Sequence, residues 1–559
     1  MVFQNNLLMG AASISSDAAY TIDYSCRFND NDSAYMQRTF GAGNDELFSV
    51  SFWFKWGNLT DSTFLNAESG ASSRWRYDTA SEQLQIYSVG DSSYVYGNPV
   101  FRDPSAWYHF LLVWDLSEVS GNRVQWYVNG VRITATNSTE PTSSSTYVIN
   151  TAIAHEIGSR EGSSIFLDGY LSQYCFIDNA AKLPTDFGEF NNGVWRPIDI
   201  TGLDYTGTNS FLLDFADSSN LGNDVSGNDN DWATSGLAAA DQMTDTPTKN
   251  FSTLNSIQEV WTAAVTLTDG NLHGEGTAGT TGNNITGTIA VSSGKWVFAS
   301  KPAAIAGLNG DLFVCNDAGR NTKPTNTNGA ADCWAFTWQN TTLITTYDQT
   351  STTNRTASPA VAVGDYQLCA LDVDNLAIWF GIYDATAGTT VWTDNSTGFT
   401  GDPTDGGTTK SGTLVTSGGN NFYMGAAFYT GRSADLDFGQ GALLSDIAIP
   451  TGYKLVNTAN LAEPTIKNSK KYFDTILYEG TGTGQKVGQF QPITETYSVG
   501  NSALWIEGDS TFLSRTPSSA GNRRTGSLSF WCKRGTTGAI KQLYNSGAGN
   551  DITFNASDK

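Results

Sequence analysis

The chain has 559 residues, of which 15% are charged, and it carries 31 Lys and Arg against 55 Asp and Glu, a net charge of −24. Such an acidic excess repels phosphate groups, so binding to nucleic acid or to an anionic membrane is not expected. The length allows about three or four domains of roughly 150 residues. Abundant Gly, Ser, Thr and Asn, without long helix-forming runs, predict an all-β protein of short strands.

The first segment, residues 1–15, is apolar but too short to fold alone. It has neither the basic region nor the full apolar stretch of a secretory signal, and no run in the sequence approaches the roughly 18 apolar residues of a membrane span. This segment contains four large apolar side chains that would favour aggregation if they were exposed: Phe3, Leu7, Leu8 and Met9. We expect them to dock into a partner protein, and the alternative is a buried first strand of the next domain.

Residues 16–245 predict a first antiparallel sandwich. Asn129-Gly130 stands between two β-prone runs, which is a strong signal for a hairpin turn. Further aromatic or alternating runs predict strands at residues 48–55, 107–114, 123–134 and 165–178. Short strands with turns at this spacing are typical of a β-sandwich or jelly roll.

The end of this first domain is rich in Asp and Asn between residues 214 and 231, as is the short run 29–32. Calcium prefers several oxygen ligands from one flexible loop, so Asp224, Asp229 and Asp231 are candidate ligands. Asn and Asp also bond to their own backbone in Asx turns, which produces the same composition. The spacing is not that of an EF-hand, and both interpretations stay open.

Residues 246–465 predict a second sandwich. Its expected strands lie at residues 294–299, 364–374, 377–383 and 421–428. Residues 466–495 are Lys-rich and then Gly- and Thr-rich, which predicts a connector.

Residues 496–559 repeat the sequence pattern of the first sandwich. Residues 497–516 align without a gap with residues 20–39, sharing the pattern Asp-Ser-x-aromatic-x-x-Arg-Thr, and after one inserted residue SFWCK at 529–533 matches SFWFK at 51–55. This segment predicts an incomplete second copy of the first sandwich. Because an interrupted sandwich cannot complete its core, we expect the natural chain to continue past Lys559, or partner chains to hold this segment.

Six cysteines are scattered through the chain without a CxxC pair: Cys26, Cys175, Cys315, Cys333, Cys369 and Cys532. Several lie in apolar runs, which predicts buried free thiols and synthesis in a reducing cytoplasm. Cys315 and Cys333 are expected to pair only if their strands are neighbours.

The sequence offers little material for catalysis. The only histidines are His109, His155 and His273, and His109 lies in an aromatic strand where a core position is expected. With so few, a histidine-based metal site or a catalytic triad is not expected. No Gly-rich phosphate loop followed by Lys-Ser/Thr is present either.

Hydrolysis of glycans by a pair of carboxyl groups is not predicted either. The Glu-x-Asp-x-x-Glu spacing of retaining glucanases is missing. Asp435 with Asp437, and Asp372 with Asp374, are each expected on one strand face, but neither pair predicts catalysis. The aromatic residues Trp75, Tyr94, Tyr96 and Trp195 are candidates for stacking on sugar rings, although core packing explains most such residues.

The ordered motifs SFWFKW, WYHFLLVWD, WYVNGVRI and FLDGYLSQYCFID resemble a laminin-G/concanavalin A-like jelly roll. In the second domain, GKWVFA and GDYQLCALDVD resemble a SPRY-type sandwich. DFGQ at 437–440, PTGYKLVNTANL at 450–461 and YFDTILY at 472–478 resemble parts of phage structural proteins. Together with the opening FQNNLLMGAA, they make the chain similar to tail fibres of tailed phages.

This resemblance implies a virion structural protein without enzymatic activity and without a cofactor, calcium excepted. It would be made in the host cytoplasm, be located in the virion tail, and be anchored through its first residues to a tail adaptor or tail tube. The resemblance further implies a homotrimer that contacts a host-surface glycan or protein. The alternatives are a capsid-decorating or head fibre, a glycan depolymerase, and a cellular adhesin, which would require an export signal.

Overall fold

The computed structural model describes residues 20–68, 72–88, 92–95, 101, 103–133, 140–142, 147–191, 194–257, 265–277, 283–305, 309–322, 331–461, 512–516, 518–519, 530, 541–545 and 551–554. Contacts divide the chain into two units, Met1–Thr494 and Glu495–Lys559. The first unit contains two β-sandwiches of antiparallel sheets, so the predicted all-β class of tandem sandwiches is confirmed.

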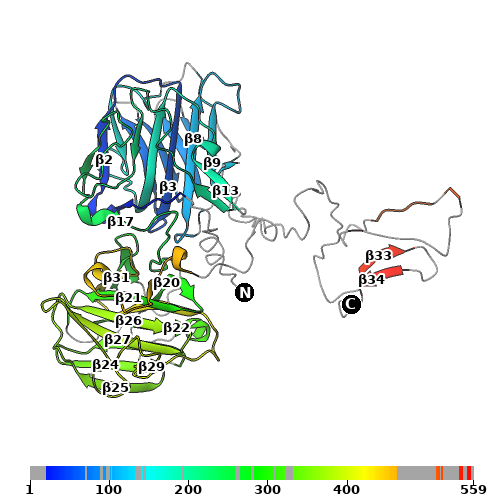
Figure 1. Ribbon diagram of the computed structural model, residues 1–559. Helices are drawn as coiled ribbons and strands as arrows, with labels where there is room; N and C mark the ends of the chain where they lie inside the picture. Colours follow the sequence, from blue (N-terminus) through cyan, green and yellow to red (C-terminus); the bar gives the residue numbers. More distant parts are fainter. Residues whose placement is uncertain are drawn as a thin grey trace. The chain divides into compact units, whose positions relative to one another are not determined.

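The first sandwich pairs an eight-stranded sheet with a seven-stranded one (Figure 1, blue to green). In spatial order the larger sheet consists of β10 (Val131–Ile133), β9 (Val124–Val128), β8 (Trp107–Asp115), β3 (Leu47–Trp56), β12 (Gly169–Asp178), β1 (Ser25–Phe28) and β17 (Gln242–Met243), with β15 (Phe211–Leu213) beside β12. The smaller sheet consists of β16 (Ala233–Ser235), β2 (Tyr35–Thr39), β11 (Ala154–Ile157), β4 (Ser62–Glu68), β5 (Ser72–Asp78), β6 (Gln83–Ser88) and β7 (Ser92–Val95).

Aromatic side chains fill the space between these two sheets. Phe52 of β3 stacks on Tyr174 of β12 at a ring distance of 4.9 Å and meets Trp75 of β5 at 5.0 Å. Trp75 in turn packs edge-on against Trp126 of β9 at 4.8 Å. Burial of such rings is the main stabilising term of the fold.

The outer face of the eight-stranded sheet is also covered, by later parts of the chain. Phe187, Ile200 and Tyr205 pack over β8 and β12, and Trp195 belongs to a further cluster with Trp53 of β3. The covering segment includes the hairpin of β13 (Gly188–Asn191) and β14 (Val194–Pro197). Short 3-10 turns in this sandwich are η1 (Asp30–Asp32), η2 (Pro184–Asp186) and η3 (Ala239–Asp241). The seven-stranded sheet therefore carries the other broad face of this sandwich.

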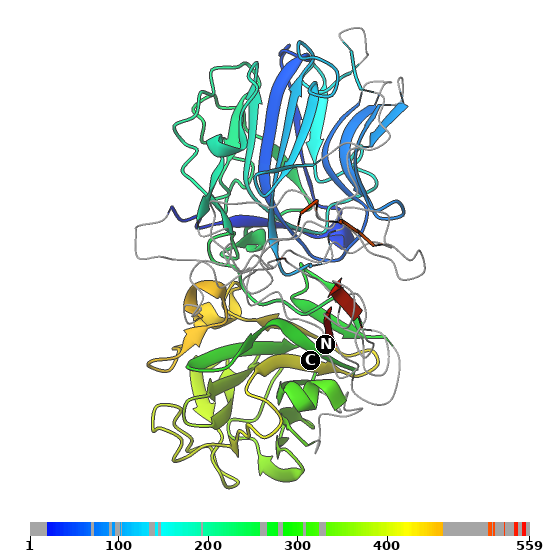
Figure 2. The same cartoon turned by 90° about the vertical axis from the view of Figure 1, so that its right-hand side faces the viewer.

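The second sandwich also has two sheets (Figure 2, green to yellow). The nine-stranded sheet consists of β18 (Val265–Thr268), β19 (His273–Gly276), β31 (Ser433–Asp437), β21 (Lys295–Pro302), β26 (Tyr366–Asp372), β27 (Ala377–Asp384) and β28 (Thr389–Trp392), with β29 (Gly412–Thr413) beside β27 and β32 (Lys454–Leu455) parallel to β21. The six-stranded sheet consists of β20 (Asn283–Val291), β30 (Phe422–Phe428), β22 (Asn309–Asn316), β23 (Cys333–Trp338), β24 (Leu343–Asp348) and β25 (Ser351–Thr356). Helical segments are α2 (Asp317–Thr322), η4 (Leu443–Asp446) and η5 (Thr458–Asn460).

The strongest local signals in the sequence correspond to real elements. Asn129 and Gly130 form the turn between β9 and β10 with φ of 48° and 74°, as the Asn-Gly pair predicts. The strand expected over residues 165–178 was too long at its start, because β12 begins at Gly169. Ile165 has a φ of 51°, which a strand does not allow.

The second unit contains a described hairpin of β33 (Lys541–Asn545) and β34 (Asp551–Phe554). Extending the alignment of the repeated segment places β33 on β4 and β34 on β5. In that alignment the hairpin pair Asn545 and Asp551 corresponds to the pair Ala67 and Ser73 of the first sandwich. Each hairpin also has a register shift in its first strand, between Gln542 and Tyr544 in β33 and between Thr63 and Leu65 in β4. The two shifts lie within one residue of each other in the alignment. The hairpin agrees with a second copy of the sandwich.

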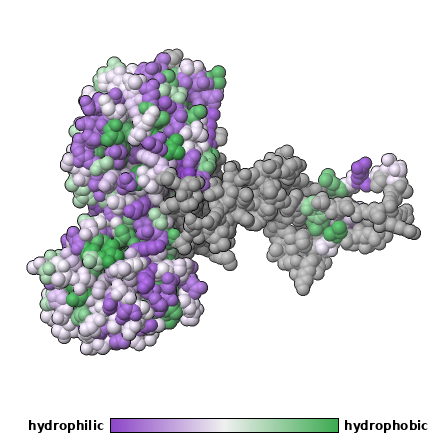
Figure 3. Space-filling view, in the orientation of Figure 1, coloured by the Kyte–Doolittle hydropathy of each residue, from purple (hydrophilic) through white to green (hydrophobic). Residues whose placement is uncertain are grey.

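The surface of the two sandwiches mixes polar and apolar residues on the face drawn in Figure 3. The exposed apolar side chains include Val119, Leu183, Phe190 and Val363. Within the described ranges, no helix is both long enough and apolar enough to cross a membrane.

Candidate functional site

Four polar side chains form one row across the outer face of the seven-stranded sheet. Gln37 of β2 pairs in register with Glu156 of β11, Glu156 pairs with Asn66 of β4, and Asn66 pairs with Arg74 of β5. Side chains alternate between the two faces of a strand. Their neighbours along the strands belong to the core: Met36, Ile157, Ala67 and Trp75. We call Gln37, Glu156, Asn66 and Arg74 the polar row.

Glu156 is the centre of the polar row. Its Oε1 accepts a hydrogen bond from Gln37 Nε2 at 3.2 Å, and its Oε2 accepts one from Asn66 Nδ2 at 3.4 Å. Ser159 Oγ and the Gly162 backbone N–H also donate to Oε2, each at 3.1 Å. Donors from two strands and from the turn after β11 therefore fix the position of this carboxylate.

The polar row passes from an exposed end to a buried one. Gln37 is exposed, whereas Asn66 is 1% exposed and Arg74 is 6% exposed. Asn66 Oδ1 accepts no hydrogen bond from any residue that the structure describes. A buried amide oxygen without a donor costs about 1–3 kcal/mol. Because this atom is itself buried, a ligand hydroxyl would reach it only if the side chains around it moved.

The chemistry of the polar row suits a carbohydrate better than a reaction. Its two amides, guanidinium and carboxylate together supply both donors and acceptors, as the hydroxyl groups of a sugar require. Hydrolysis by two carboxyl groups requires a second one about 5–9 Å from the first. Glu156 is the single carboxylate of the row, so the row by itself does not form such a pair.

The three candidate calcium ligands lie in one loop. Backbone N–H groups already donate hydrogen bonds to Asp224, the buried member of the three. Asp224 Oδ1 accepts from the N–H groups of Leu212 and Ser226 at 2.9 and 2.8 Å, and its Oδ2 accepts from the N–H of Asn230 at 2.9 Å. Asp231 Oδ1 accepts from the N–H of Asp224 at 2.8 Å, and exposed Asp229 has a φ of 54°. The bond from Ser226 is that of an Asx turn, whereas the other three join separate parts of the chain. Backbone groups therefore satisfy these carboxylates, and the calcium site stays an untested prediction.

Replacing Asp224 with alanine should lower the free energy of unfolding by about 3 kcal/mol, because several buried N–H groups lose their acceptor. Asp229→Asn is the matched control, since it removes a candidate ligand charge without touching those bonds. Chemical denaturation measures both variants. If these hydrogen bonds to backbone groups hold the loop, EDTA leaves the melting temperature of the unaltered chain unchanged. If EDTA lowers the melting temperature and added calcium restores it, this explanation is wrong.

A set of three other residues, Asp269, His273 and Asp435, has side chains of the kind that bind metal ions. Among the described residues, the potential ligand atoms of Asp269, His273 and Asp435 lie within 4.8 Å of one another. An imidazole with two carboxylates is a donor set that Zn²⁺ accepts. However, His273 Nδ1 already contacts Asp435 Oδ1 at 2.6 Å, and Asn29 Nδ2 donates to Asp269 Oδ1 at 2.8 Å. Hydrogen bonds therefore account for the three groups without an ion.

The other two histidines are structural. His109 is buried against Ser51 Oγ, 2.8 Å from its Nε2, and burial lowers the pKa of His109 to about 3. His155 stacks on Phe40 at 3.8 Å, accepts from the N–H of Asn150, and has its pKa lowered by burial to about 4. The predicted core position of His109 is confirmed.

The carboxylate pairs differ from the expectation in one case. Asp435 and Asp437 lie on one face of β31, and Asp437 is buried, where it accepts from the N–H groups of Gly439 and Leu444. The expectation for Asp372 and Asp374 was wrong, because β26 ends at Asp372. The chain turns there, so the two carboxylates do not share a strand face.

The four aromatic candidates do not form a sugar-stacking surface in the described structure. Trp75 is fully buried in the core. Trp195 is 8% exposed and lies so close to Gly130 that a Cβ added there would be 2.5 Å from its ring. The side chain of Tyr94, all of Tyr96, and the anchoring residues Phe3, Leu7, Leu8 and Met9 lie outside the described residues.

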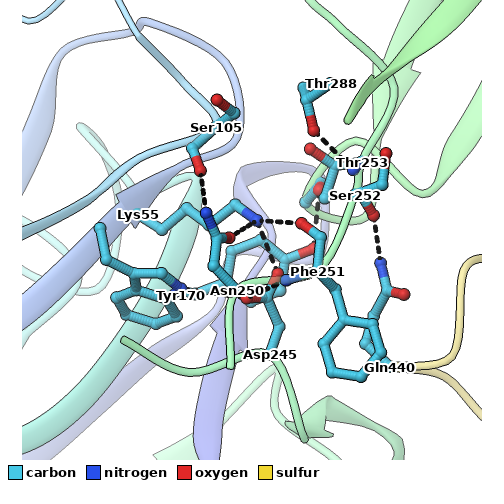
Figure 4. Close-up of polar contacts among 12 residues, drawn as sticks. Lys55, Ser105, Tyr170, Asp245, Asn250, Phe251, Ser252, Thr253, Thr288 and Gln440 are labelled. Carbon is cyan, nitrogen blue, oxygen red and sulfur yellow. Dashed lines mark hydrogen bonds and ion pairs between the residues drawn. The ribbon is translucent and has the colours of Figure 1, made fainter. Parts of the chain in front are cut away.

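A buried polar network connects the first sandwich to the segment that leads into the second (Figure 4). Lys55 of β3 donates from Nζ to Asp245 Oδ2 at 2.7 Å, Asn250 Oδ1 at 2.8 Å and the Phe251 carbonyl at 2.9 Å. Trp107 Nε1 donates to the other carboxylate oxygen of Asp245 at 3.0 Å. The side chains of Lys55 and Asp245 are fully buried, so each charge depends on the other. We call Lys55, Asp245, Asn250 and Phe251 the junction.

The junction continues into the second sandwich. Gln440 Nε2 donates to the Ser252 carbonyl at 2.8 Å, and Thr288 Oγ1 accepts from the Thr253 N–H at 3.1 Å. Asn58 of the first sandwich donates to the Leu267 carbonyl at 2.9 Å. The two sandwiches of this unit are therefore joined by specific polar bonds and not by the chain alone.

Beside the junction, Asp168 is a buried carboxylate whose Oδ2 accepts from Asn58 Nδ2 at 2.8 Å. Burial, followed by the negative charge of Asp30, raises the pKa of Asp168 to about 7. Because this pKa lies above that of the unfolded chain, the stabilising contribution is complete in acid and is lost as the pH rises through about 7. The pKa of His273 is also raised, first by its hydrogen bond to Asp435, so it acts in the same direction.

Asp168→Asn should therefore gain stability relative to the unaltered chain as the pH rises from about 4 to about 7, because only the unaltered chain must ionise this buried carboxyl group. Comparing the two chains isolates this effect from His109 and His155, whose lowered pKa values act in the opposite direction. At pH 8 the asparagine variant should be the more stable chain, by up to about 4 kcal/mol for a shift of about three pKa units. Thermal unfolding followed at several pH values measures the effect. An equally steep pH dependence in the variant would show that Asp168 is not responsible.

The comparisons with known proteins fit the first sandwich. Residues 30–182 match a family model for the concanavalin A-like lectin/glucanases superfamily. The matched residues include all four members of the polar row, Gln37, Asn66, Arg74 and Glu156. No curated protein matches the chain.

Solved structures are similar to parts of the chain at low identity and with low TM-scores. One described as a carbohydrate-binding protein from Bacteroides ovatus is 16% identical, with a TM-score of 0.27, over 39% of this chain and 58% of its own. The PSpry domain of TRIM65 is 10% identical, with a TM-score of 0.24, over 33% and 89% of the two chains. Domain 4 of the arabinanase AbnA from Geobacillus stearothermophilus, in complex with arabinotriose, is 19% identical, with a TM-score of 0.21, over 27% and 68%. The chain thus spans less than two thirds of the first of these proteins, and at such scores none supports an inference about function.

Proposed function

We propose that the first sandwich binds a host-surface glycan along the polar row, without cleaving it, as part of a tail fibre of a tailed phage. The observation that carries the glycan proposal is the in-register row of Gln37, Glu156, Asn66 and Arg74 on a lectin-type sheet, with Asn66 Oδ1 lacking a donor among the described residues. The single carboxylate of the row favours binding over hydrolysis.

Sequence features support the assignment to a fibre. Two sandwiches follow one another, and the first starts again near residue 497, as in an array of similar modules on a long appendage. A row this small makes few contacts, so several copies on one particle would raise the avidity. In this proposal residues 1–15 attach to a tail adaptor or tail tube, and the chain forms a homotrimer.

The binding part is tested with the purified full chain on a panel of bacterial surface polysaccharides. The proposal expects retention of the chain on at least one of them and no new reducing ends after prolonged incubation. Release of reducing ends would favour the alternative of a glycan depolymerase. Failure to bind any polysaccharide, while a host protein is bound, would overturn the glycan proposal.

The location is tested separately, by electron microscopy of phage particles labelled with an antibody against the first sandwich. Label on the tail supports the tail fibre. Label on the capsid surface would favour the head fibre or capsid-decorating alternative, and particles without label would remove the virion role altogether.

A further inference from the structure

Two cysteines of the second sandwich face each other directly across neighbouring strands. Cys315 of β22 and Cys333 of β23 are register partners in an antiparallel pair. Residues in such positions have Cα atoms about 4.5–5.5 Å apart, within the range that a disulfide bridges. The two thiols are hydrogen-bonded to each other, and both are free. Their strands are thus neighbours, which was the condition for pairing.

The two thiols are enclosed on the outer face of the six-stranded sheet. Both side chains are fully buried, in a cluster with Phe313, Tyr347 and Tyr423. Helix α2, which follows β22 at once, covers them. A Cβ added to Gly319 of this helix would lie 3.0 Å from Cys333 Sγ.

Contacts of Asp317, Ala318 and Arg320 hold the first turn of α2, including a bond from the Ala318 N–H to the Gly418 carbonyl at 2.7 Å. Asp317 accepts from Asn421 Nδ2 and from Tyr423 Oη at 3.0 Å, and the Arg320 guanidinium lies 4.7 Å from the centre of the Tyr423 ring. A helix of six residues has little stability of its own. Opening of α2 is therefore the local motion that would expose the two sulfur atoms.

We propose that Cys315 and Cys333 form a disulfide once the chain meets a disulfide oxidant such as glutathione disulfide. The thiolate of one cysteine attacks the oxidant, forms a mixed disulfide and releases one glutathione thiolate. The second cysteine, as thiolate, attacks the protein sulfur of the mixed disulfide and releases the other. The two protein thiols lose two electrons and two protons, which together reduce glutathione disulfide to two glutathione thiols, the protons being carried by solvent.

The chemistry of the pair fits a bond that forms late. Burial and the neighbouring thiol raise the pKa of Cys315 well above its ordinary value, which suppresses its thiolate while α2 is closed. The bond would close the loop that contains α2 and fix this segment on the sheet. A chain folded with free thiols would thereby gain a covalent lock after transfer to an oxidising medium.

The test incubates the full chain with glutathione disulfide, then alkylates the remaining thiols under denaturing conditions and maps the peptides by mass spectrometry. The proposal expects Cys315 and Cys333 to escape alkylation and their two peptides to appear joined, while Cys26, Cys175 and Cys369 are alkylated. The melting temperature of the second sandwich should rise by about 5–10 °C, as for a closed loop of roughly 20 residues, and dithiothreitol should reverse the rise.

Variants make the test specific. Cys315→Ala and Cys333→Ala should each abolish the rise, whereas Cys369→Ala, which changes another buried cysteine of the same sandwich, should retain it. Peptide mapping of the unaltered chain remains decisive if a variant does not fold. Alkylation of both cysteines after oxidation, or a lasting mixed disulfide with glutathione at either one, would overturn the proposal.

Discussion

Replacing Asp245 with alanine should lower the free energy of unfolding of the first sandwich by about 3–5 kcal/mol, the usual effect of breaking a buried ion pair. The change would leave the Lys55 ammonium buried beside only neutral acceptors, and Trp107 Nε1 and the Phe251 N–H would lose their acceptor. Burial already lowers the pKa of Lys55, which the charge of Asp245 opposes. Without that charge, Lys55 must lose its proton or draw water into the junction.

The double variant Lys55→Met with Asp245→Leu is the matched control. Because two apolar residues of similar size remove both buried charges together, it should regain most of the lost stability. Denaturation followed by tryptophan fluorescence measures all the variants. If the free energy of unfolding of Asp245→Ala lies within about 1 kcal/mol of that of the unaltered chain, the ion pair does not contribute substantially to the stability of the junction.

The second large effect is expected on ligand binding. Asn66→Ala should weaken the binding of the selected polysaccharide at least tenfold, about 1.4 kcal/mol, because the polar row loses the buried amide between Glu156 and Arg74. Gln37→Ala should weaken binding less, since Gln37 is the exposed member. Calorimetric titration of each variant with the polysaccharide gives the comparison.

Arg132→Ala is the control for this series, because Arg132 is an exposed residue on β10 of the other sheet. It should bind as the unaltered chain does. Thermal unfolding identifies any variant that loses affinity only because it is destabilised. If Asn66→Ala and the control bind the polysaccharide with equal affinity, the polar row is not the binding site.

Much of the fold was predictable because its signals are local. The alternation of residues 48–55 and the Asn-Gly turn at 129–130 specify strands and a hairpin from a few neighbouring residues. The repeated segment was visible for the same reason, and the register of β33 with β34 agrees with it.

The candidate site was not predictable from such signals. Gln37 and Glu156 are 119 residues apart, and only the order of β2, β11 and β4 in the sheet brings them together with Asn66. In β5 the alternation of Arg74, Trp75 and Arg76 does indicate which side chains face outward. It does not indicate which strand lies beside β5, and therefore which polar groups share the row.

The junction was missed for a related reason. Lys55 and Asp245 are 190 residues apart. In the sequence Lys55 is an ordinary charged residue near the end of an aromatic strand. Its burial depends on the segment around Asn250 and Phe251, which packs over the end of that strand.

The central claim is that the first sandwich binds glycan along the polar row, and hydrogen exchange of the full chain with and without the selected polysaccharide tests it most directly. Bound glycan should slow exchange in peptides from β2, β4, β5 and β11 and leave those from β9 and β10 unchanged. Slowed exchange confined to the second sandwich, or to the hairpin of β13 and β14, would contradict the claim.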